Sequence, residues 1–324
     1  MKRLLLCFLA LLLVFLSGCA SEHQAAPEPA TQDKLSVVVS FYAMEELARE
    51  IGGDAITIHT VIPSGEEPHD FQPKASDLSA LSQADVFIIN GCDLEEWAPK
   101  AIATAHNPKL RVVTASDGAD IHYIEMKQVL PGQKEEKAAD PHVWLSLKNA
   151  KVEARNMRDA FVAADPAHAA YYNERYARFT GKADSLLAEY TRKFAAAQRH
   201  TFVTGHAAFS YMASDFNLTQ LSLSNVFAAG EPSIHHLKNL ADECRRDGLT
   251  TVFMEAGESP RIPNTLAREI GARVEVIETL EEGDGTETYL ETMQKNLEKL
   301  YQSMIKKCRP RSRSGIFSAY LFGV

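Results

Sequence analysis

The chain has 324 residues, of which 45% are hydrophobic and 24% are charged, and it carries 34 Lys and Arg against 43 Asp and Glu. This composition is typical of a globular protein and excludes collagen, a coiled coil and wholesale disorder. The formal net charge of -9 argues against a protein whose main partner is nucleic-acid phosphate. Because a single hydrophobic core stops growing near about 250–300 residues, the length favours two lobes.

The first 18 residues have the pattern of a signal peptide. A basic dipeptide precedes an uninterrupted apolar run at 4–16, which is shorter than the roughly 20 residues that cross a bilayer as a helix. The run ends in Leu16-Ser17-Gly18-Cys19, which resembles a bacterial lipobox. We therefore expect lipidation of the Cys19 thiol, the alternative being a soluble secretory signal with an incidental cysteine. The polar stretch 19–33 is then a lipid-anchored flexible linker.

From Leu35 onward, short β-rich segments alternate with amphipathic stretches of helical length. The expected strands are 35–40, 56–62, 86–90 and 111–114, and then 201–204, 219–223, 250–255 and 274–278. Such alternation is typical of parallel sheets with crossover helices, and two separate sets predict two α/β lobes. Ligands of such folds bind beyond the carboxyl ends of the strands.

One long helix is predicted between the two sets of strands. Asp165-Pro166 provides a helix start, and no proline follows before about Gln198. Apolar residues recur every three or four positions through this stretch, at Tyr172, Tyr176, Phe179, Ala183, Leu186, Tyr190 and Phe194. A helix of about 33 residues would be about 50 Å long, enough to join both lobes stiffly and to limit their movement.

The predicted fold is therefore α/β, with two lobes that each hold a mainly parallel four-stranded sheet flanked by helices. The expected segments are an N-terminal lobe at 34–160, a long rigid bridging helix at 161–199 and a C-terminal lobe at 200–308. The tail at 309–324 turns from basic to apolar and has no predicted role.

Three of the eleven histidines stand at boundaries of this pattern. His69 lies in the loop after the second strand, His142 follows Asp140-Pro141, and His206 comes directly after the first strand of the second lobe. Glu278 ends a later strand. Turn-forming residues flank each histidine and would fix its direction. Taken singly, each is more often a structural or solvent-facing histidine than a ligand.

Three of the five cysteines remain after the signal peptide and the lipidated residue are set aside. Cys92 follows an apolar strand and is interpreted as a small buried hydrophobe. Cys244 and Cys308 are candidates for one disulfide in an oxidising compartment, or else for two free thiols.

Several motifs, in their order and spacing, resemble the zinc/manganese solute-binding lipoproteins of bacterial ABC importers. Besides the lipobox they are PSGEEPHDFQPKASD at 63–77, ADPHVWLSLKNA at 139–150, VTGHAAFSY at 203–211, GEPS at 230–233 and VIETL at 276–280. The resemblance covers nearly the whole chain to about Cys308. It implies two α/β lobes bridged by one long helix, with the metal held between them.

The resemblance also implies a set of ligands, two from each lobe: His69, His142, His206 and Glu278. The family more often has Asp at the last position, so Glu281, Glu282 or a water is the alternative fourth ligand. Glu66 and Glu67 are interpreted as solvated loop carboxylates rather than as supports for the site. In addition, the resemblance implies a disulfide between Cys244 and Cys308.

The ligand set favours zinc. Three imidazole nitrogens and one carboxylate suit tetrahedral Zn²⁺, whereas Mn²⁺ prefers more oxygen ligands. Members that resemble the manganese type usually have a carboxylate where His206 stands. Against zinc, the stretch 117–139 contains only His122 in place of the histidine-rich loop of many zinc members. We expect Zn²⁺ as the transported ion, with Mn²⁺ or Fe²⁺ as the alternative.

The sequence therefore predicts a lipid-anchored extracytoplasmic monomer that captures Zn(II) and delivers it to a membrane permease, without enzymatic activity. An extracytoplasmic zinc hydrolase is disfavoured because the chain has no His-Glu-x-x-His pair, Gly-x-Ser-x-Gly elbow or Walker loop. A surface adhesin, a role attributed to some relatives, is neither supported nor excluded by any feature of the sequence.

Overall fold

A computed structural model describes residues 34–66, 68, 71–125, 137–227 and 232–305. The predicted signal peptide, lipobox, linker and tail lie outside the described residues, and so does His69. The described residues belong to one compact unit. Residues 34–164 are called the first half below, and residues 201–305 the second half. Over the described ranges, no helix combines the length and the apolar character needed to cross a membrane.

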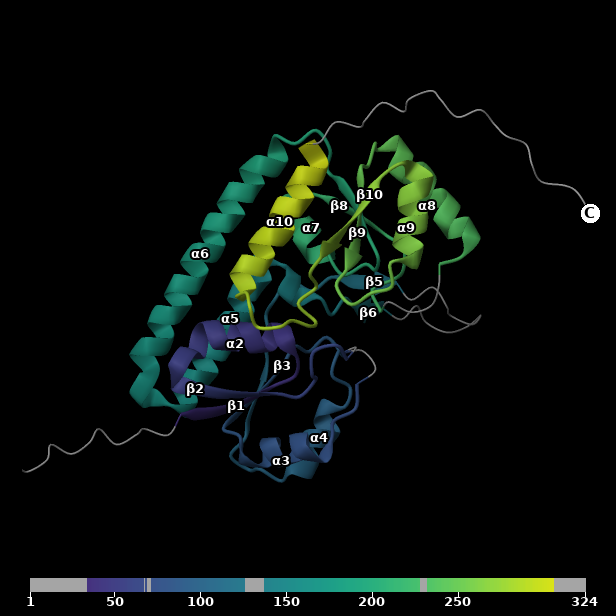
Figure 1. The fold of residues 1–324 in the computed structure, drawn as a ribbon. Helices are drawn as coiled ribbons and strands as arrows, with labels where there is room; N and C mark the ends of the chain where they lie inside the picture. The colour runs from purple at the N-terminus through teal and green to yellow at the C-terminus, as the bar shows by residue number, and fades with distance from the viewer. Residues whose placement is uncertain (1–33, 67, 69–70, 126–136, 228–231, 306–324) are drawn as a thin grey trace, which may run out of the picture. The chain divides into compact units, whose positions relative to one another are not determined.

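Four parallel strands form the sheet of the first half, in the order β2-β1-β3-β4 (Figure 1). The strands are β1 (Leu35–Val39), β2 (Ile56–Thr60), β3 (Val86–Ile89) and β4 (Arg111–Thr114). The central strand β1 sets the register, because Val37 pairs with Ile58 on one side and with Val86 on the other. The two central strands are almost entirely buried, whereas the edge strands alternate or expose one end. This sheet confirms the predicted parallel α/β class.

Helices cover both faces of this sheet, as expected for crossover connections. They are α2 (Tyr42–Gly52) with the short η1 (Gly53–Ala55), α3 (Ala75–Gln83), α4 (Ala98–Ala105) and α5 (Leu147–Ala164). The helices α2 and α5 pack together on one face, and α3 and α4 pack together on the other (Figure 1). An antiparallel pair, β5 (Tyr123–Glu125) and β6 (Lys137–Ala139), and the 3-10 turn η3 (Val143–Leu145) precede α5 and were not predicted.

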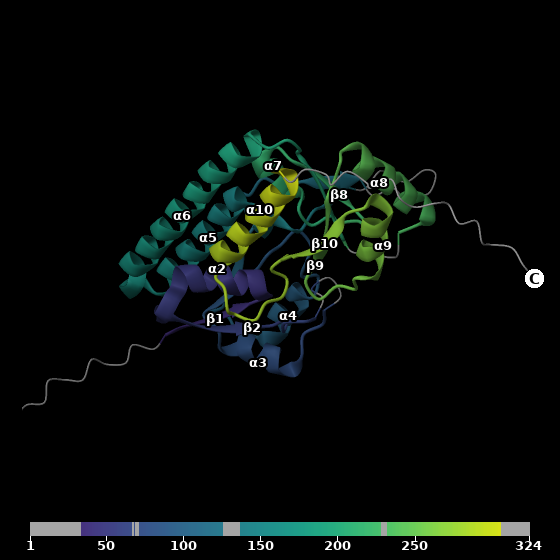
Figure 2. The ribbon, with the colours of Figure 1, turned by 45° about the horizontal axis from the view of Figure 1, so that its top comes forward.

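The long helix predicted between the strand sets is α6 (Ala169–Ala195), with 27 residues. It follows the 3-10 turn η4 (Pro166–His168), because the Asp165 carboxylate accepts hydrogen bonds from His168 Nδ1 and the Tyr172 hydroxyl and so holds a tighter first turn. The predicted apolar stripe is buried except at Tyr176, which is partly buried. The helix contacts α2 and α5 of the first half and α7 and α10 of the second (Figures 1 and 2).

The second half repeats the strand-helix alternation. Its elements are β7 (Thr201–Thr204), α7 (Ser210–Phe216), β8 (Thr219–Ser222), α8 (Ile234–Arg246), β9 (Thr251–Glu255), α9 (Arg261–Ile270), β10 (Arg273–Ile277) and α10 (Tyr289–Ile305). The strands form two parallel pairs, β7-β8 and β9-β10, and β7 lies beside β9. Carboxyl ends of β7, β9 and β10 therefore point to one edge, where ligands of such folds bind.

A shared hydrophobic core joins the two halves. It contains Val38 and Trp144 from the first half, Phe179 from α6, and Phe209 and Leu297 from the second half. A second, smaller core lies within the second half alone and includes Val203, Leu240, Cys244, Val252 and Leu266. Because close-packed cores resist deformation, this shared core limits relative movement of the halves.

Glu153 of α5 is a buried acid whose carboxyl group has no hydrogen-bond partner among the described residues. Its side chain is fully buried. Burial, followed by the charge of the buried Glu95, raises the pKa of Glu153 to about 8. An unpaired buried carboxylate is costly, so Glu153 is held as the neutral acid at neutral pH.

Glu153 should make the protein less stable as the pH rises. The unfolded chain loses this proton near pH 4.5 and the folded chain near pH 8, so the free energy of unfolding falls across that interval. We expect Glu153→Leu to be more stable than the wild type at pH 8 by about 1–3 kcal/mol, with a smaller gain at pH 5. Urea denaturation at both pH values measures this, with the exposed Glu174→Leu as control. An equal gain at both pH values would contradict the assignment.

Candidate metal centre

His142, His206 and Glu281 meet at one point of the structure. His142 Nε2 lies 3.3 Å from His206 Nε2 and 3.3 Å from Glu281 Oε1. The three ligand atoms all lie within 4.8 Å of one another. Both histidines are buried, and the Glu281 side chain is 12% exposed. Within the described ranges, no other group of three or more His, Cys, Asp and Glu side chains is close enough to hold a metal ion.

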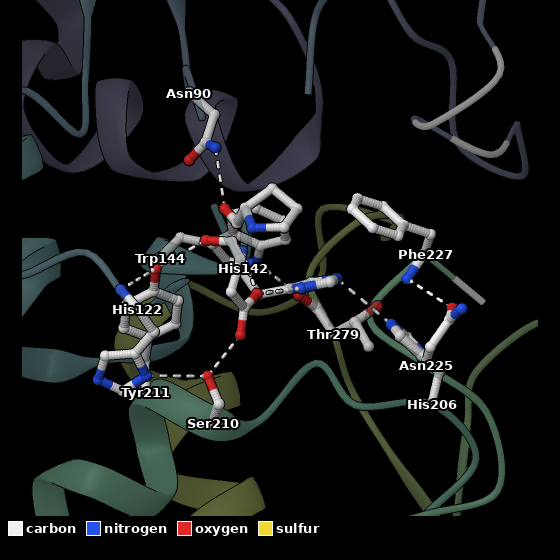
Figure 3. Close-up of polar contacts among 12 residues, drawn as sticks. Asn90, His122, His142, Trp144, His206, Ser210, Tyr211, Asn225, Phe227 and Thr279 are labelled. Atoms are coloured by element: carbon white, nitrogen blue, oxygen red, sulfur yellow. Dashed lines mark hydrogen bonds and ion pairs between the residues drawn. The ribbon is translucent and has the colours of Figure 1, made fainter. Parts of the chain in front are cut away.

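Asp140 decides which nitrogen of His142 faces this point. Its Oδ1 accepts a hydrogen bond from the His142 backbone N–H at 3.1 Å and another from ring Nδ1 at 2.8 Å (Figure 3). The proton on Nδ1 is thereby directed to Asp140, which leaves Nε2 toward His206 and Glu281. A carboxylate on the distal nitrogen of a metal-binding histidine fixes the ring and raises its basicity.

Asp140 is held in turn by α7 of the second half (Figure 3). The Ser210 hydroxyl donates to Asp140 Oδ2, and the Tyr211 hydroxyl donates to the Asp140 carbonyl at 2.6 Å. His122 stacks on the Tyr211 ring with 4.1 Å between centroids, and its Nδ1 lies 3.1 Å from the Ser210 oxygen. Residues of the second half therefore position a candidate ligand of the first half.

Asn90 fixes the other end of the same segment. Its side-chain amide donates to the Pro141 carbonyl at 2.9 Å. Asn90 precedes a tight turn in which Gly91, Cys92 and Asp93 all have left-handed backbone angles, with φ of 93°, 53° and 60°. Such conformations are costly for residues other than glycine and persist only where surrounding contacts impose them. Here the buried Glu95 carboxylate accepts the N–H groups of Asn90 and Gly91 at 2.8 and 3.0 Å.

Trp144 ties the His142 segment to the residues around the acidic ligand. Its indole N–H donates to the Thr279 carbonyl at 2.7 Å (Figure 3), and its own carbonyl accepts a hydrogen bond from the Tyr289 hydroxyl at 2.5 Å. Both partners lie on the chain that leaves β10 and enters α10. The two halves are therefore joined by hydrogen bonds immediately next to the candidate ligands.

His206 is positioned at the end of β7 by a carboxylate from the neighbouring strand. Glu255, the last residue of β9, accepts the His206 backbone N–H at 3.0 Å, and ring Nδ1 lies 3.4 Å from the same oxygen. Glycine at 205 leaves room for this carboxylate, because a Cβ would lie 2.0 Å from Glu255 Oε2 and Glu255 would have to move. The His206 carbonyl accepts hydrogen bonds from Thr204 and Gln220. Nε2 is again the nitrogen that faces the candidate ligands.

Glu281, rather than Glu278, lies with the two histidines. Leu280 has a left-handed backbone with φ of 61°, so the chain turns there instead of continuing the strand, and Glu281 Oε2 accepts a hydrogen bond from Thr279 at 2.7 Å. Glu278 has its backbone held by Asn296 and lines a separate cleft with Lys299.

The remaining acidic candidates lie apart from the three-residue group. Glu282 lines the same cleft as Glu278. Glu66 is exposed and forms an ion pair with Lys74 at 3.1 Å. Glu67 and the predicted ligand His69 lie outside the described residues.

The surroundings of His142 favour a positive charge on its ring. Burial opposes the charge on His142, but hydrogen bonds to Asp140 and Glu281 raise the His142 pKa to about 9. Burial also opposes ionisation of Glu281, but the hydrogen bond from His142 and the nearby histidine charges lower the Glu281 pKa to about 2. Asp140 has a lowered pKa because hydrogen bonds from His142 and Ser210 outweigh its burial. His142 is therefore a buried cation between two carboxylates.

Two imidazole nitrogens and one carboxylate oxygen at this spacing can bind a transition-metal cation. They supply three of the four ligands of a tetrahedral zinc site. Each histidine also has a carboxylate beside its distal nitrogen, as metal-binding histidines commonly do. The donor set therefore fits Zn²⁺ better than the oxygen-rich surroundings that Mn²⁺ prefers.

Sequence reasoning missed the supporting residues. Asp140 and Ser210 lie inside two of the quoted motifs, and Asp140 stands two residues before a candidate ligand, which is a usable signal. Glu255 ends a predicted strand, so its position at the ligand edge could also have been inferred. The bond to Thr279 depends on a main-chain carbonyl and leaves no signal in the sequence.

Of the predicted disulfide pair Cys244 and Cys308, the structure describes only Cys244. Cys244 of α8 is fully buried and carries a free thiol among the described residues, and burial raises its pKa to about 12. Cys308 lies outside the described residues. Cys92 is half-buried, with its sulfur 3.7 Å from the Ser116 hydroxyl.

The chain is similar to several known proteins in sequence and in structure. The high-affinity zinc uptake system protein ZnuA of Bacillus subtilis (strain 168) is 31% identical over 318 residues, which are 93% of this chain and 96% of that protein. The zinc-binding lipoprotein AdcA of Streptococcus pneumoniae is 30% identical over 94% of this chain, which spans only 61% of AdcA. The Zn(II)-bound ZnuA-like domain of AdcA is 29% identical with a TM-score of 0.69, covering 85% of this chain and 100% of that domain.

A third relative is the laminin-binding protein Lmb of Streptococcus agalactiae, whose structure is described as that of a bifunctional protein with adhesin and metal transporting activity. It is 34% identical with a TM-score of 0.74, covering 84% of this chain and 100% of Lmb. The likeness extends over both halves of the molecule.

The model of one protein family, the zinc-uptake complex component A, periplasmic, matches residues 37–303. Members of this family are extracytoplasmic solute-binding components of metal importers and are not enzymes. The resemblance and the fold class inferred from the sequence are confirmed, and the chain belongs to the family of the periplasmic zinc-uptake complex component A.

Proposed function

We propose that this protein binds one Zn(II) ion outside the cytoplasmic membrane and delivers it to the permease of a metal ABC importer. The single observation that carries the proposal is the meeting of His142, His206 and Glu281 at one buried point. Each histidine presents Nε2 there, and each has a carboxylate beside Nδ1. This is a prepared cation site rather than a chance contact of surface groups.

The proposed ligands are His142, His206, Glu281 and His69. The first three are supported by their mutual distances. His69 is proposed from the family resemblance, because it stands in the motif PSGEEPHDFQPKASD. This motif follows β2 in the chain. Glu278 is not proposed as a ligand, since its side chain lines the cleft with Lys299.

Zinc is proposed over manganese and iron because nitrogen donors predominate. His206 provides a nitrogen ligand at the position where a carboxylate would favour Mn²⁺. The relatives named for zinc, ZnuA and AdcA, support the same choice. Manganese or iron remains the alternative cargo. An adhesin role, described for Lmb, has no specific support among the described residues of this chain.

Binding of different metals, compared between the wild type and variants that each lack one candidate ligand, tests the site directly. We expect the wild type to hold one zinc, and His206→Ala to lose tight binding. Glu281→Ala should weaken zinc binding on the order of 10- to 100-fold or more, whereas the matched control Glu278→Ala should leave it unchanged. Competition with a chromophoric chelator, together with elemental analysis, measures affinity and stoichiometry for zinc, manganese and iron separately.

Weaker zinc binding by Glu278→Ala, together with unchanged binding by Glu281→Ala, would identify Glu278 as the acidic ligand. A preference for manganese would make the protein a manganese importer component, and the absence of any tightly held metal would overturn the proposed function.

Zinc affinity should fall as the pH falls. Zinc must displace the Nε2 proton of His142, whose pKa of about 9 keeps that proton in place at neutral pH in the metal-free protein. Below this pKa, each pH unit should therefore change the apparent affinity by about tenfold for that one proton. Calorimetry in buffers of different ionisation enthalpy counts the protons released per zinc. Affinity that stays constant between pH 6 and 8 would contradict histidine ligation.

The covalent state of the chain is also proposed: a diacylglyceryl group on Cys19 anchors a monomer to the membrane, and Cys244 pairs with Cys308. Support for the anchor is the lipobox-like Leu16-Ser17-Gly18-Cys19. Intact mass of protein extracted from cells, before and after reduction, should show the lipid and a gain of two hydrogens. An unmodified mature chain would contradict the anchor, and an unchanged mass on reduction would contradict the disulfide.

A further inference from the structure

Residues of the first half of the chain contact the connection that carries Glu281. This connection, residues 278–288, joins β10 to α10 and passes alongside α2 in both views (Figures 1 and 2). Gly283 lies against the ring of Tyr42, the first residue of α2, so closely that a Cβ on Gly283 would lie 2.1 Å from Tyr42 Cε1. Gly283 does not have a left-handed backbone. Glycine is therefore needed at this position for close approach and not for its backbone angle.

A second contact fixes the same residue. The Ser64 hydroxyl donates to the Gly283 carbonyl at 2.5 Å, and the Ser64 oxygen lies 3.4 Å from the Gly283 nitrogen as an acceptor. The Tyr42 hydroxyl lies 3.5 Å from the carbonyl of Glu287, further along the connection. Ser64 belongs to the loop that follows β2. We call Tyr42, Ser64 and Gly283 the Gly283 notch.

The Gly283 notch is the part of the site where the backbone has space to move. His142 and His206 are each buried and held by a carboxylate and by several further hydrogen bonds. The Glu281 carboxylate has only the Thr279 hydroxyl as a neutral donor within the described structure. Tyr42, Ser64 and Gly283 also line a cleft of about 570 Å³, so the connection has open space on one side. Glu281 is thus the described ligand whose position depends most on a contact at the surface.

We infer that the Gly283 notch is a positioning device, which holds Glu281 against the two histidines and sets how long the bound cation is retained. The inference rests on the proposed zinc-binding function. Gly283 lies two residues after Glu281 in the second half, whereas its notch partners Tyr42 and Ser64 belong to the first half. Opening the notch would therefore withdraw one ligand without disturbing the hydrogen bonds that hold the histidines.

Gly283→Ala opens the notch without altering a ligand. The new Cβ cannot fit against the Tyr42 ring where it lies, and we expect the connection to shift and to carry Glu281 with it. We expect one zinc to bind still, but to be lost to excess chromophoric chelator on the order of 10- to 100-fold faster than from the wild type. Stopped-flow absorbance on the zinc-loaded mature protein measures this rate. Melting of the metal-free variant, followed by circular dichroism, checks that it folds.

Three further variants separate positioning from a general structural effect. Gly181→Ala in α6 is the matched control, because no described atom outside its own helix lies within 4 Å of the new Cβ, and it should release zinc at the wild-type rate. In a Tyr42→Ala background the clash is absent, so Gly283→Ala should add little to the rate. In a Glu281→Ala background the ligand is already missing, and Gly283→Ala should again add little.

The outcomes distinguish this inference from the proposed function. A wild type that holds no zinc would overturn the proposed function itself. A wild type that holds zinc tightly, with Gly283→Ala releasing it at the same rate, would overturn the notch alone. Faster release that persists in the Glu281→Ala background would show that the notch does not act through Glu281.

Discussion

The hydrogen bond between His142 Nδ1 and Asp140 is the interaction on which the site depends. At 2.8 Å, and with both side chains almost fully buried, it selects Nε2 as the nitrogen that faces His206 and Glu281. A buried carboxylate is costly unless donors surround it, and α7 supplies one of these donors through Ser210. The orientation of the proposed ligand His142 therefore depends on both halves of the chain. Loss of that packing would remove the site together with the fold around it.

The same packing restricts how a cation can leave. One hydrophobic core runs from β1 through α6 to α10, and Trp144 and Tyr289 join the halves by hydrogen bonds beside the ligands. Wide separation of the halves would expose this core to water at a large cost in free energy. Movement of a single ligand-bearing connection costs much less. The stiff bridge that α6 provides is thus compatible with release through the connection between β10 and α10.

Periodicity and turn chemistry were sufficient for much of the fold, but local backbone detail was not predictable. The stripe from Tyr172 to Phe194 in α6 and the parallel strands follow directly from apolar spacing. The resemblance implies Glu278, which ends an expected strand, as the acidic ligand. The left-handed turn at Leu280, which redirects the chain and brings Glu281 to the histidines, has no glycine or asparagine to signal it. The buried Glu153 likewise looks like any surface acid in the sequence, because its burial depends on tertiary packing.

Charge explains why this arrangement suits a divalent cation. A protonated His142 directs Nδ1–H to Asp140 and Nε2–H to Glu281, so two carboxylates face the single positive charge of one imidazolium ring. Exchange of the Nε2 proton for Zn²⁺ adds one positive charge where burial makes an uncompensated carboxylate most costly. The imidazole nitrogens of the proposed site favour zinc over the harder Mn²⁺.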